Sequence, residues 1–182
     1  MNHRPRGAIF AAAVLLSLPA CMREGEVRAA GGVMPTVKLF DAAGASLGAV
    51  SVRDGAGRLA ITVNASGLAP GTHGIHLHET GRCEGPKFAS AGAHWNPGMK
   101  KHGRDNPEGA HLGDLANFEV AGSGTATASF TVAGATVASG AAMLADADGT
   151  ALVIHAKADD YKTDPSGASG DRVACAVLAP PR

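Results

Sequence analysis

The stretch "HGIHLHE", residues 73–79, alternates imidazole side chains with apolar ones. Side chains two residues apart share one face of a β-strand. If Ile75 and Leu77 face a core, His76 and His78 lie together on the outer face of the sheet. The stretch therefore predicts a strand with an apolar side and a side that could hold half of a metal site.

Seven further short runs are alternating or β-branched, and Gly, Asp, Asn or Pro bounds each of them. They are "TVKLF", "GAVSV", "LAITVNA", "ANFEV", "ATASFTV", "ALVIHA" and "RVACAVL". No segment has a convincing helical period. With the opening stretch, the eight runs predict an all-β fold, an antiparallel barrel or sandwich.

Length and composition agree with one small β domain. The chain has 182 residues, an ordinary length for a single domain. Aromatic residues make up only 4% of it, which suits small core side chains in a sheet. The 16 basic and 16 acidic residues balance, so the charge gives no indication of nucleic-acid binding.

The N-terminus predicts export. Arg4 and Arg6 precede an apolar run of 13 residues, "AIFAAAVLLSLPA". This run is too short to span a bilayer but suits the core of a signal peptide. Residues 1–20 are therefore the predicted signal peptide.

The run leads into "LPAC", residues 18–21, which resembles a bacterial lipoprotein box. Cys21 would then be lipidated, and residues 21–32 would be a polar, Gly-rich tether from the anchor to a domain at residues 33–182. The alternative is ordinary cleavage after "VRA", residues 27–29, with loss of Cys21. Either route exports the protein, to the periplasm or to a lipid anchor on the cell envelope, and no other membrane contact is expected.

Two cysteines remain once Cys21 is set aside, Cys83 and Cys175. An exported protein can be oxidised, so they could form one disulfide. That bridge would close a loop of about 90 residues and stabilise the fold by roughly 4 kcal/mol in the chain-entropy model. Two buried free thiols are the alternative.

Two long stretches, residues 79–115 and 156–171, interrupt the strand pattern. Structureless loops of this length are usually functional or disordered. The first loop contains the spacing H-x7-H-x8-H-x2-D, and three imidazole nitrogens with one carboxylate oxygen suit a structural, tetrahedral Zn²⁺ site. Metal binding could order a loop that has few apolar residues. The four residues are His94, His102, His111 and Asp114.

Strand parity predicts on which face the remaining histidines of the domain lie. His155 has the parity opposite to the apolar Leu and Ile of its run, so it could join His76 and His78 on the outer face if the strands are neighbours. His73 has the parity of the core residues. We interpret His73 as a structural histidine that hydrogen-bonds to the backbone, not as a ligand.

Taken together, these motifs resemble the copper/zinc superoxide dismutase family. "HGIHLHE", "GAHWNP", "KHG", "AHLGDL", "VIHAKADD" and "GDRVACAV" occur in that family's order, and the resemblance covers roughly residues 33–182. It implies an eight-stranded Greek-key barrel with two long functional loops. It also implies one copper ion and one zinc ion per subunit. The copper ligands would be His76, His78, His94 and His155, and the zinc ligands His94, His102, His111 and Asp114.

The resemblance implies further roles near these ions. His94 would bridge the two metals. Asp159 would accept hydrogen bonds from one ligand of each metal, and such outer contacts orient the rings. Arg172 would draw in the anionic substrate, and Cys83 and Cys175 would form the family disulfide.

The implied activity is the dismutation of superoxide to O₂ and H₂O₂. Nitrogen-rich sites favour Cu²⁺, which cycles by one electron where zinc cannot. Arg172 offers a fixed positive charge to a small anion, and His94 offers a proton to peroxide. The alternative is a non-catalytic periplasmic store of copper or zinc; such proteins usually lack copper ligands or the arginine, and this chain has them. The resemblance does not determine subunit number, and a homodimer is compatible with it.

Overall fold

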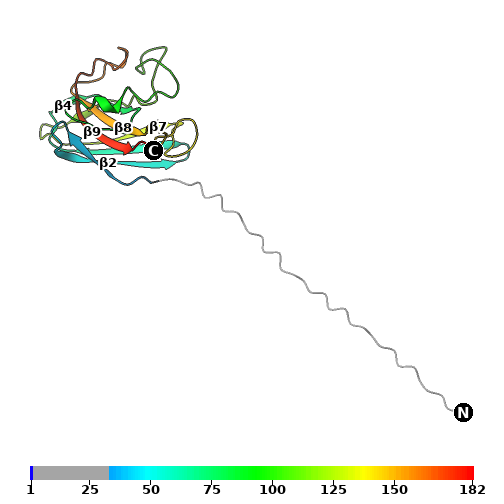
Figure 1. Cartoon of the computed structure of the whole chain (residues 1–182). Helices are drawn as coiled ribbons and strands as arrows, with labels where there is room; N and C mark the ends of the chain where they lie inside the picture. The colour runs from blue at the N-terminus through cyan, green and yellow to red at the C-terminus, as the bar shows by residue number, and fades with distance from the viewer. Residues whose placement is uncertain (2–32) are drawn as a thin grey trace.

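The computed structural model describes Met1 and residues 33–182 (Figure 1). The predicted signal peptide, the tether and Cys21 lie outside the described residues. Within the described part, regular structure consists of strands and one 3₁₀ turn, η1 (Ala89–Ala91). That part also contains no helix long and apolar enough to cross a membrane.

The strands form a curled antiparallel sheet of seven strands and a small sheet of two. The larger sheet has the order β5-β8-β9-β1-β2-β3-β7, and the smaller one pairs β4 with β6. Strands distant in the chain, such as β9 and β1, are thus neighbours, and the predicted all-β fold is confirmed. The bounds are β1 (Val37–Asp41), β2 (Ser46–Gly55), β3 (Arg58–Ala65), β4 (Gly71–His73), β5 (Ile75–His78), β6 (Phe118–Val120), β7 (Ala126–Ala133), β8 (Thr150–His155) and β9 (Arg172–Ala179).

Gly74 divides the predicted strand at residues 73–78 into β4 and β5, so nine strands occur where eight runs were recognised. The second long loop crosses the chain at this point. The Gly74 N–H donates to the Lys157 carbonyl, at 2.8 Å. A Cβ at Gly74 would lie 3.1 Å from the Ser169 Cβ, so close approach of this loop favours glycine here.

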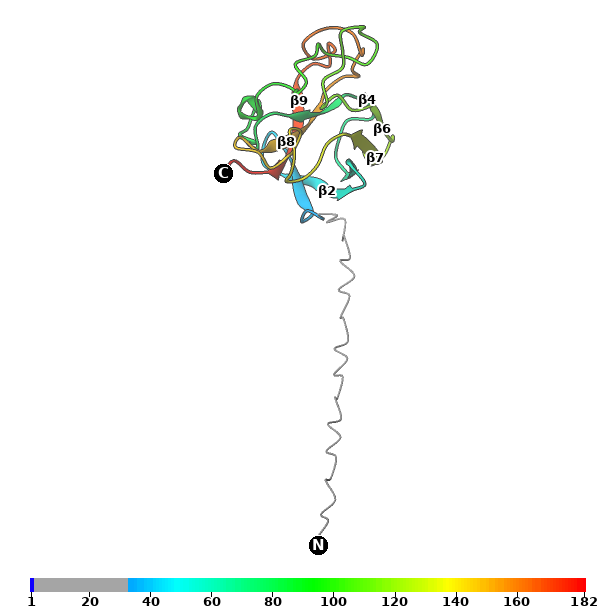
Figure 2. The ribbon, with the colours of Figure 1, turned by 90° about the vertical axis from the view of Figure 1, so that its right-hand side faces the viewer.

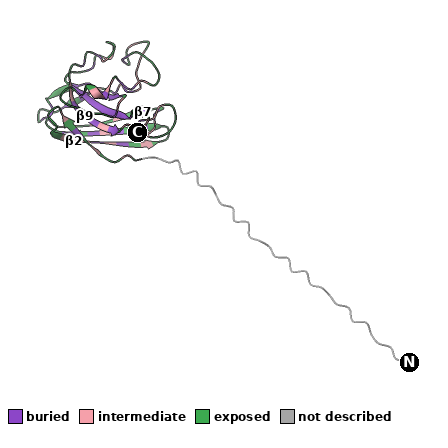
Figure 3. Ribbon diagram, in the orientation of Figure 1, coloured by how far each residue is buried: buried purple, intermediate pink, exposed green. Residues whose placement is uncertain are grey.

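The register of β5 and β8 confirms the alternation predicted for both strands. Leu77 pairs with Leu152, and both are fully buried in the main core. His76 pairs with Val153 on the opposite face. Every residue of β5 and β8 is nevertheless buried (Figure 3), so the outer face is covered too.

The two long loops provide this cover. They emerge together at one end of the sheet, as the green and orange segments of Figures 1 and 2 show. Residues of the first loop pack over the outer face in a second apolar cluster, in which Phe88 and Ala91 contact Val153 and Cys175. The outer face of β5 and β8 therefore forms the floor of a site whose roof is made of loops.

Candidate metal centre

Four imidazoles meet on the outer face of the sheet. His76 and His78 come from β5, His155 from the end of β8, and His94 from the first loop. One nitrogen of each lies within 4.8 Å of the corresponding nitrogens of the other three. Two strands and the first loop thus bring the four imidazoles together at a single point.

In each of these four rings, one nitrogen lies within hydrogen-bond distance of an acceptor, and the other has no hydrogen-bond partner among the described residues. The nitrogens that face acceptors are His76 Nε2 on Asp159 at 2.7 Å, His78 Nδ1 on the Gly92 carbonyl at 3.0 Å, His94 Nδ1 on Asp114 at 2.9 Å and His155 Nδ1 on the Gly170 carbonyl at 3.2 Å. A carbonyl or carboxylate only accepts, so the facing nitrogen carries the proton and the other ring nitrogen offers a lone pair.

Those lone-pair nitrogens have no partner among the described residues. Buried polar atoms are normally hydrogen-bonded, and four unpaired nitrogens facing one another would repel. A copper ion among them would satisfy all four at once, and nitrogen ligands bind Cu²⁺ strongly. The atoms are His76 Nδ1, His78 Nε2, His94 Nε2 and His155 Nε2.

Burial keeps these imidazoles in the neutral form that binds metals. It lowers the pKa of His94 to about 4, although a hydrogen bond with Asp114 opposes the shift. Burial, with the nearby His76, lowers the pKa of His155 to about 3. Burial also lowers the pKa of His78 well below its usual value. No proton therefore competes with a metal ion at these nitrogens near neutral pH.

A second cluster surrounds the carboxylate of Asp114. Its Oδ1 lies 2.9 Å from His94 Nδ1, 3.1 Å from His102 Nδ1 and 3.1 Å from His111 Nδ1. Ligands placed tetrahedrally around Zn²⁺ at about 2.0 Å are roughly 3.3 Å apart, so this group has nearly the size of a zinc shell. His94 belongs to both clusters through its two nitrogens.

Asp114 also orders the loop that contributes to this cluster. Its Oδ2 accepts hydrogen bonds from the N–H groups of Gly103, at 2.9 Å, and His111, at 3.0 Å. Burial would raise the pKa of Asp114, but hydrogen bonds from His102, His94 and Gly103 hold it well below its usual value. The carboxylate is therefore ionised and available to a cation.

The Asp159 carboxylate connects the two clusters. Its Oδ2 lies 2.7 Å from His76 Nε2 and its Oδ1 lies 3.0 Å from His102 Nε2. Burial lowers the pKa of His102, but hydrogen bonds with Asp114 and Asp159 outweigh it and raise the pKa to about 9. One carboxylate thus orients a ring on the sheet and a ring on the first loop.

The ring nitrogens of His73 face two backbone carbonyls. They lie 2.6 Å from the His155 carbonyl and 2.8 Å from the Ala69 carbonyl. This side chain ties the end of β4 to the end of β8, next to the first cluster. It offers no free nitrogen to a metal.

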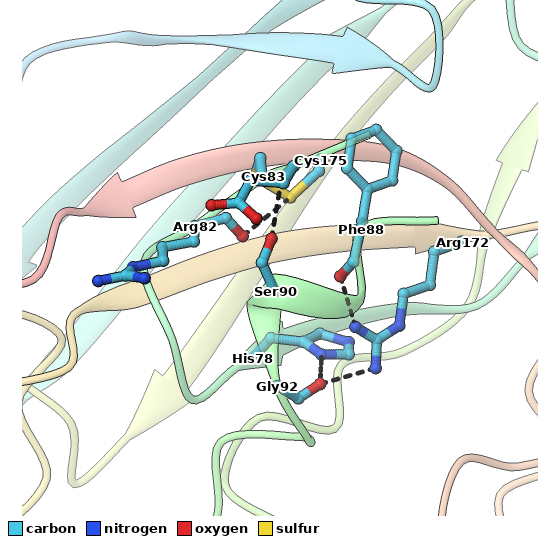
Figure 4. Close-up of a disulfide and its surroundings, with 9 residues drawn as sticks. His78, Arg82, Cys83, Phe88, Ser90, Gly92, Arg172 and Cys175 are labelled. Atoms are coloured by element: carbon cyan, nitrogen blue, oxygen red, sulfur yellow. Dashed lines mark hydrogen bonds between the residues drawn. A yellow bond between two sulfur atoms is a disulfide. The ribbon is translucent and has the colours of Figure 1, made fainter. Parts of the chain in front are cut away.

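Arg172, at the start of β9, is anchored by the first loop (Figure 4). Its Nη1 donates to the Phe88 carbonyl and its Nη2 to the Gly92 carbonyl, each at 2.7 Å. Gly92 also accepts from His78, so one carbonyl orients both side chains. The Cys83–Cys175 disulfide joins the same loop to β9. The predicted pairing of these cysteines is therefore present.

Three features of this region had no signal in the sequence. Asn117, which the sequence placed within the predicted strand run "ANFEV", hydrogen-bonds to the backbone N–H and carbonyl of Asp159 through its side-chain amide, at 2.9 and 2.8 Å. Gly167 packs against the Asp159 carboxylate so closely that a Cβ would overlap it. Lys87 lines a cavity of about 600 Å³ beside Arg172. All three depend on contacts between loops that are far apart in the chain.

Comparison with known proteins accounts for this geometry. The family model described as "Copper/zinc superoxide dismutase (SODC)" matches residues 46–178. The chain belongs to the copper/zinc superoxide dismutase family. Copper and zinc are the metals of this family, and the two clusters have donors suited to them.

Relatives of two kinds resemble the chain. The Cu-Zn superoxide dismutase of Caulobacter vibrioides is 41% identical over 138 residues, 74% of this chain and 79% of the relative. The superoxide dismutase-like protein YojM of Bacillus subtilis is 39% identical over 145 residues, 78% of this chain and 74% of the relative.

Solved structures include a SOD-like protein from Bacillus subtilis, with a TM-score of 0.77 at 37% identity, covering 81% of this chain and 99% of that one. The Cu/Zn superoxide dismutase of Brucella abortus superposes with a TM-score of 0.62 at 30% identity, covering 79% of this chain and 98% of that one. The fold is therefore shared by relatives whose names distinguish enzymes from enzyme-like proteins.

Gly167→Ala should weaken zinc retention by about 10- to 100-fold, because the new Cβ would overlap the Asp159 carboxylate and lie 2.7 Å from His102 Nε2, which disturbs their contact. Zinc release to a chelator measures this. Gly140→Ala is the matched control: Gly140 also has a positive φ, of 82°, but a Cβ there meets no atom within 4 Å. Equal zinc release from the two variants would show that backbone strain, not Asp159, is responsible.

Cys175→Ser should lower the free energy of unfolding of the metal-free protein by about 2–5 kcal/mol, because the chain loses a cross-link between residues 92 positions apart. The segment that presents the Phe88 and Gly92 carbonyls should also become sensitive to protease. Denaturant unfolding and limited proteolysis test both expectations. Cys83→Ser should behave alike, and the double variant should add nothing; additive effects would mean that each cysteine acts separately.

Proposed function

We propose that the protein dismutates superoxide, converting two superoxide ions and two protons to O₂ and H₂O₂. The observation that carries the proposal is the group of four buried, unpaired imidazole nitrogens, one of them on a ring that also faces the Asp114 cluster. Copper bound there supplies one-electron chemistry, and zinc bound by the second cluster supplies structural order.

His94 is the residue suited to moving a proton. Its Nε2 points to the first cluster and its Nδ1 to the second. If zinc held Nδ1, the neutral ring could carry its proton on Nε2 and donate it to a peroxide ion; without that proton, Nε2 could act as a ligand. The contact at Nδ1 keeps the ring in position between these states.

Arg172 is suited to attracting the anion. Two carbonyls hold its guanidinium beside the first cluster, and the side chain lines a cavity of about 600 Å³. Burial lowers the pKa of Arg172, but the guanidinium of an arginine in a protein stays protonated near neutral pH and so keeps its charge. Fixed positive charge at the mouth of a site raises the rate at which small anions arrive.

Purified protein loaded with copper and zinc should remove superoxide rapidly, and His78→Ala should reduce the rate by at least about 100-fold by removing one copper ligand. Superoxide decay, metal content and the thermal unfolding profile should be measured on the same samples. His78 is on the outer face, away from the main core, so the variant should still fold.

The alternative function is storage of copper or zinc without turnover. The similarity to a superoxide dismutase-like protein makes this the competing assignment. Full copper and zinc occupancy of the wild-type protein without superoxide removal would favour storage and overturn the enzyme assignment.

We further propose that the protein is exported, with residues 1–20 as signal peptide, Cys21 as lipid-bearing residue and residues 21–32 as tether to the domain at 33–182. The intact mass of the mature protein tests this. A diacylated or triacylated N-terminal Cys21 is expected; a soluble product that begins after Ala29 would favour ordinary cleavage, and an uncleaved Met1 would contradict export.

A further inference from the structure

The two long loops meet at Tyr161, which contacts the first loop and the residues just after it through three different groups. The Arg104 guanidinium lies over its ring, 3.7 Å from the centroid. Its carbonyl accepts a hydrogen bond from the Asp105 N–H at 3.1 Å. Its hydroxyl accepts one from the Asn117 N–H at 2.8 Å. Ring, backbone and hydroxyl thus each bind a separate part of the segment that leads from the first loop into β6.

On its inner side, Tyr161 reaches the carboxylate that connects the two metal clusters. Its N–H donates to Asp159 Oδ1 at 2.6 Å, the same oxygen that contacts His102. The side chain of Asn117 holds the Asp159 backbone from the other direction, accepting from its N–H and donating to its carbonyl. Tyr161 and Asn117 therefore hold each other and hold Asp159 between them.

The backbone at Tyr161 shows that this position is constrained. Its φ of 61° lies in the left-handed region, which is unfavourable for a bulky residue and is usually occupied by Gly or Asn. Gly103 of the first loop packs directly against its carbonyl, and a Cβ there would overlap the oxygen. Such strain persists where the surroundings hold a residue in place, and it concentrates near functional sites.

We propose that Tyr161 is a positioning residue for the metal centre, acting through Asn117 to hold Asp159 against His76 and His102. It touches none of the eight ligand nitrogens and oxygens of the two clusters. When the second loop docks on the first, Tyr161 holds Asp159 in place, and Asp159 then orients one imidazole in each cluster. The inference rests on the metal clusters and deepens the proposed function.

The hydroxyl is the part of Tyr161 that can be tested alone. Tyr161→Phe keeps the ring under Arg104 and the backbone contacts, but leaves the part-buried Asn117 N–H without its acceptor. Losing one hydrogen bond at a part-buried donor typically weakens the linked equilibrium by about fivefold. Because Asp159 contacts both clusters, the effect should appear in both metals and not in zinc alone.

The experiment uses the full chain loaded with copper and zinc, and a second sample with cobalt(II) in place of zinc. Tyr161→Phe should release zinc to a chelator about fivefold faster than wild type. It should also shift the visible bands of cobalt(II) and the electron paramagnetic resonance spectrum of copper(II), because both report ligand orientation. Asn117→Ser should act in the same direction, and adding Tyr161→Phe to it should cause little further change.

Glu108→Gln is the matched control. Glu108 lies in the same loop and pairs with Lys101 at 2.9 Å, both largely exposed, but it does not contact Tyr161 or Asp159. This variant should keep wild-type zinc release and spectra. If it changes them as much as Tyr161→Phe does, general loosening of the loop explains the effect and the inference is wrong.

Unchanged zinc release and unchanged spectra in Tyr161→Phe would also overturn the inference, as would fully additive effects of Tyr161→Phe and Asn117→Ser. Both readouts use bound metal and do not need turnover. Wild-type protein that binds both metals but leaves superoxide intact would contradict the proposed function alone, and the positioning role of Tyr161 would still be decided by the spectra.

Discussion

The Asp159 carboxylate is the contact on which the rest of the metal centre depends, because it contacts one imidazole of each cluster and so links their orientations. One oxygen meets His76 on the sheet, and the other meets His102 on the first loop. Orientation is therefore transferred from the sheet to the loops through a buried, ionised carboxylate, whose pKa stays low because burial is outweighed by hydrogen bonds from both histidines.

Polar contacts and one disulfide add to the apolar cluster that holds the first loop on the sheet. Asp114 accepts hydrogen bonds from two backbone N–H groups as well as facing three imidazoles. The disulfide fixes the segment whose carbonyls hold Arg172 and His78. These contacts order the residues that would hold the metal ions, so ordering of the loops and affinity for metal ions are expected to rise and fall together.

Much of this arrangement could be predicted where the pattern is local. Period-two alternation placed His76 and His78 opposite Leu77, and the pairing of Leu77 with Leu152 in the structure agrees with it. The break at Gly74 could not be predicted, because it arises from contact with a loop more than 80 residues later in the chain, and the sequence around Gly74 gives no indication of that contact. The roles of Asn117 and Tyr161 could not be predicted for the same reason: an Asn in the run "ANFEV" and a Tyr in a loop show no function until the two loops are folded together.

By itself, the sequence determined the β class, the two faces of the histidine strands and the spacing of the loop ligands, since all three follow from neighbours a few residues apart. Only the tertiary structure decided which nitrogen of each histidine is free, because that depends on an acceptor supplied by a distant segment, such as the Gly92 carbonyl for His78. It also decided that the outer face of "HGIHLHE" is buried. Solvent exposure depends on what packs on top of a strand, and here the loops that cover it are supplied from elsewhere in the chain.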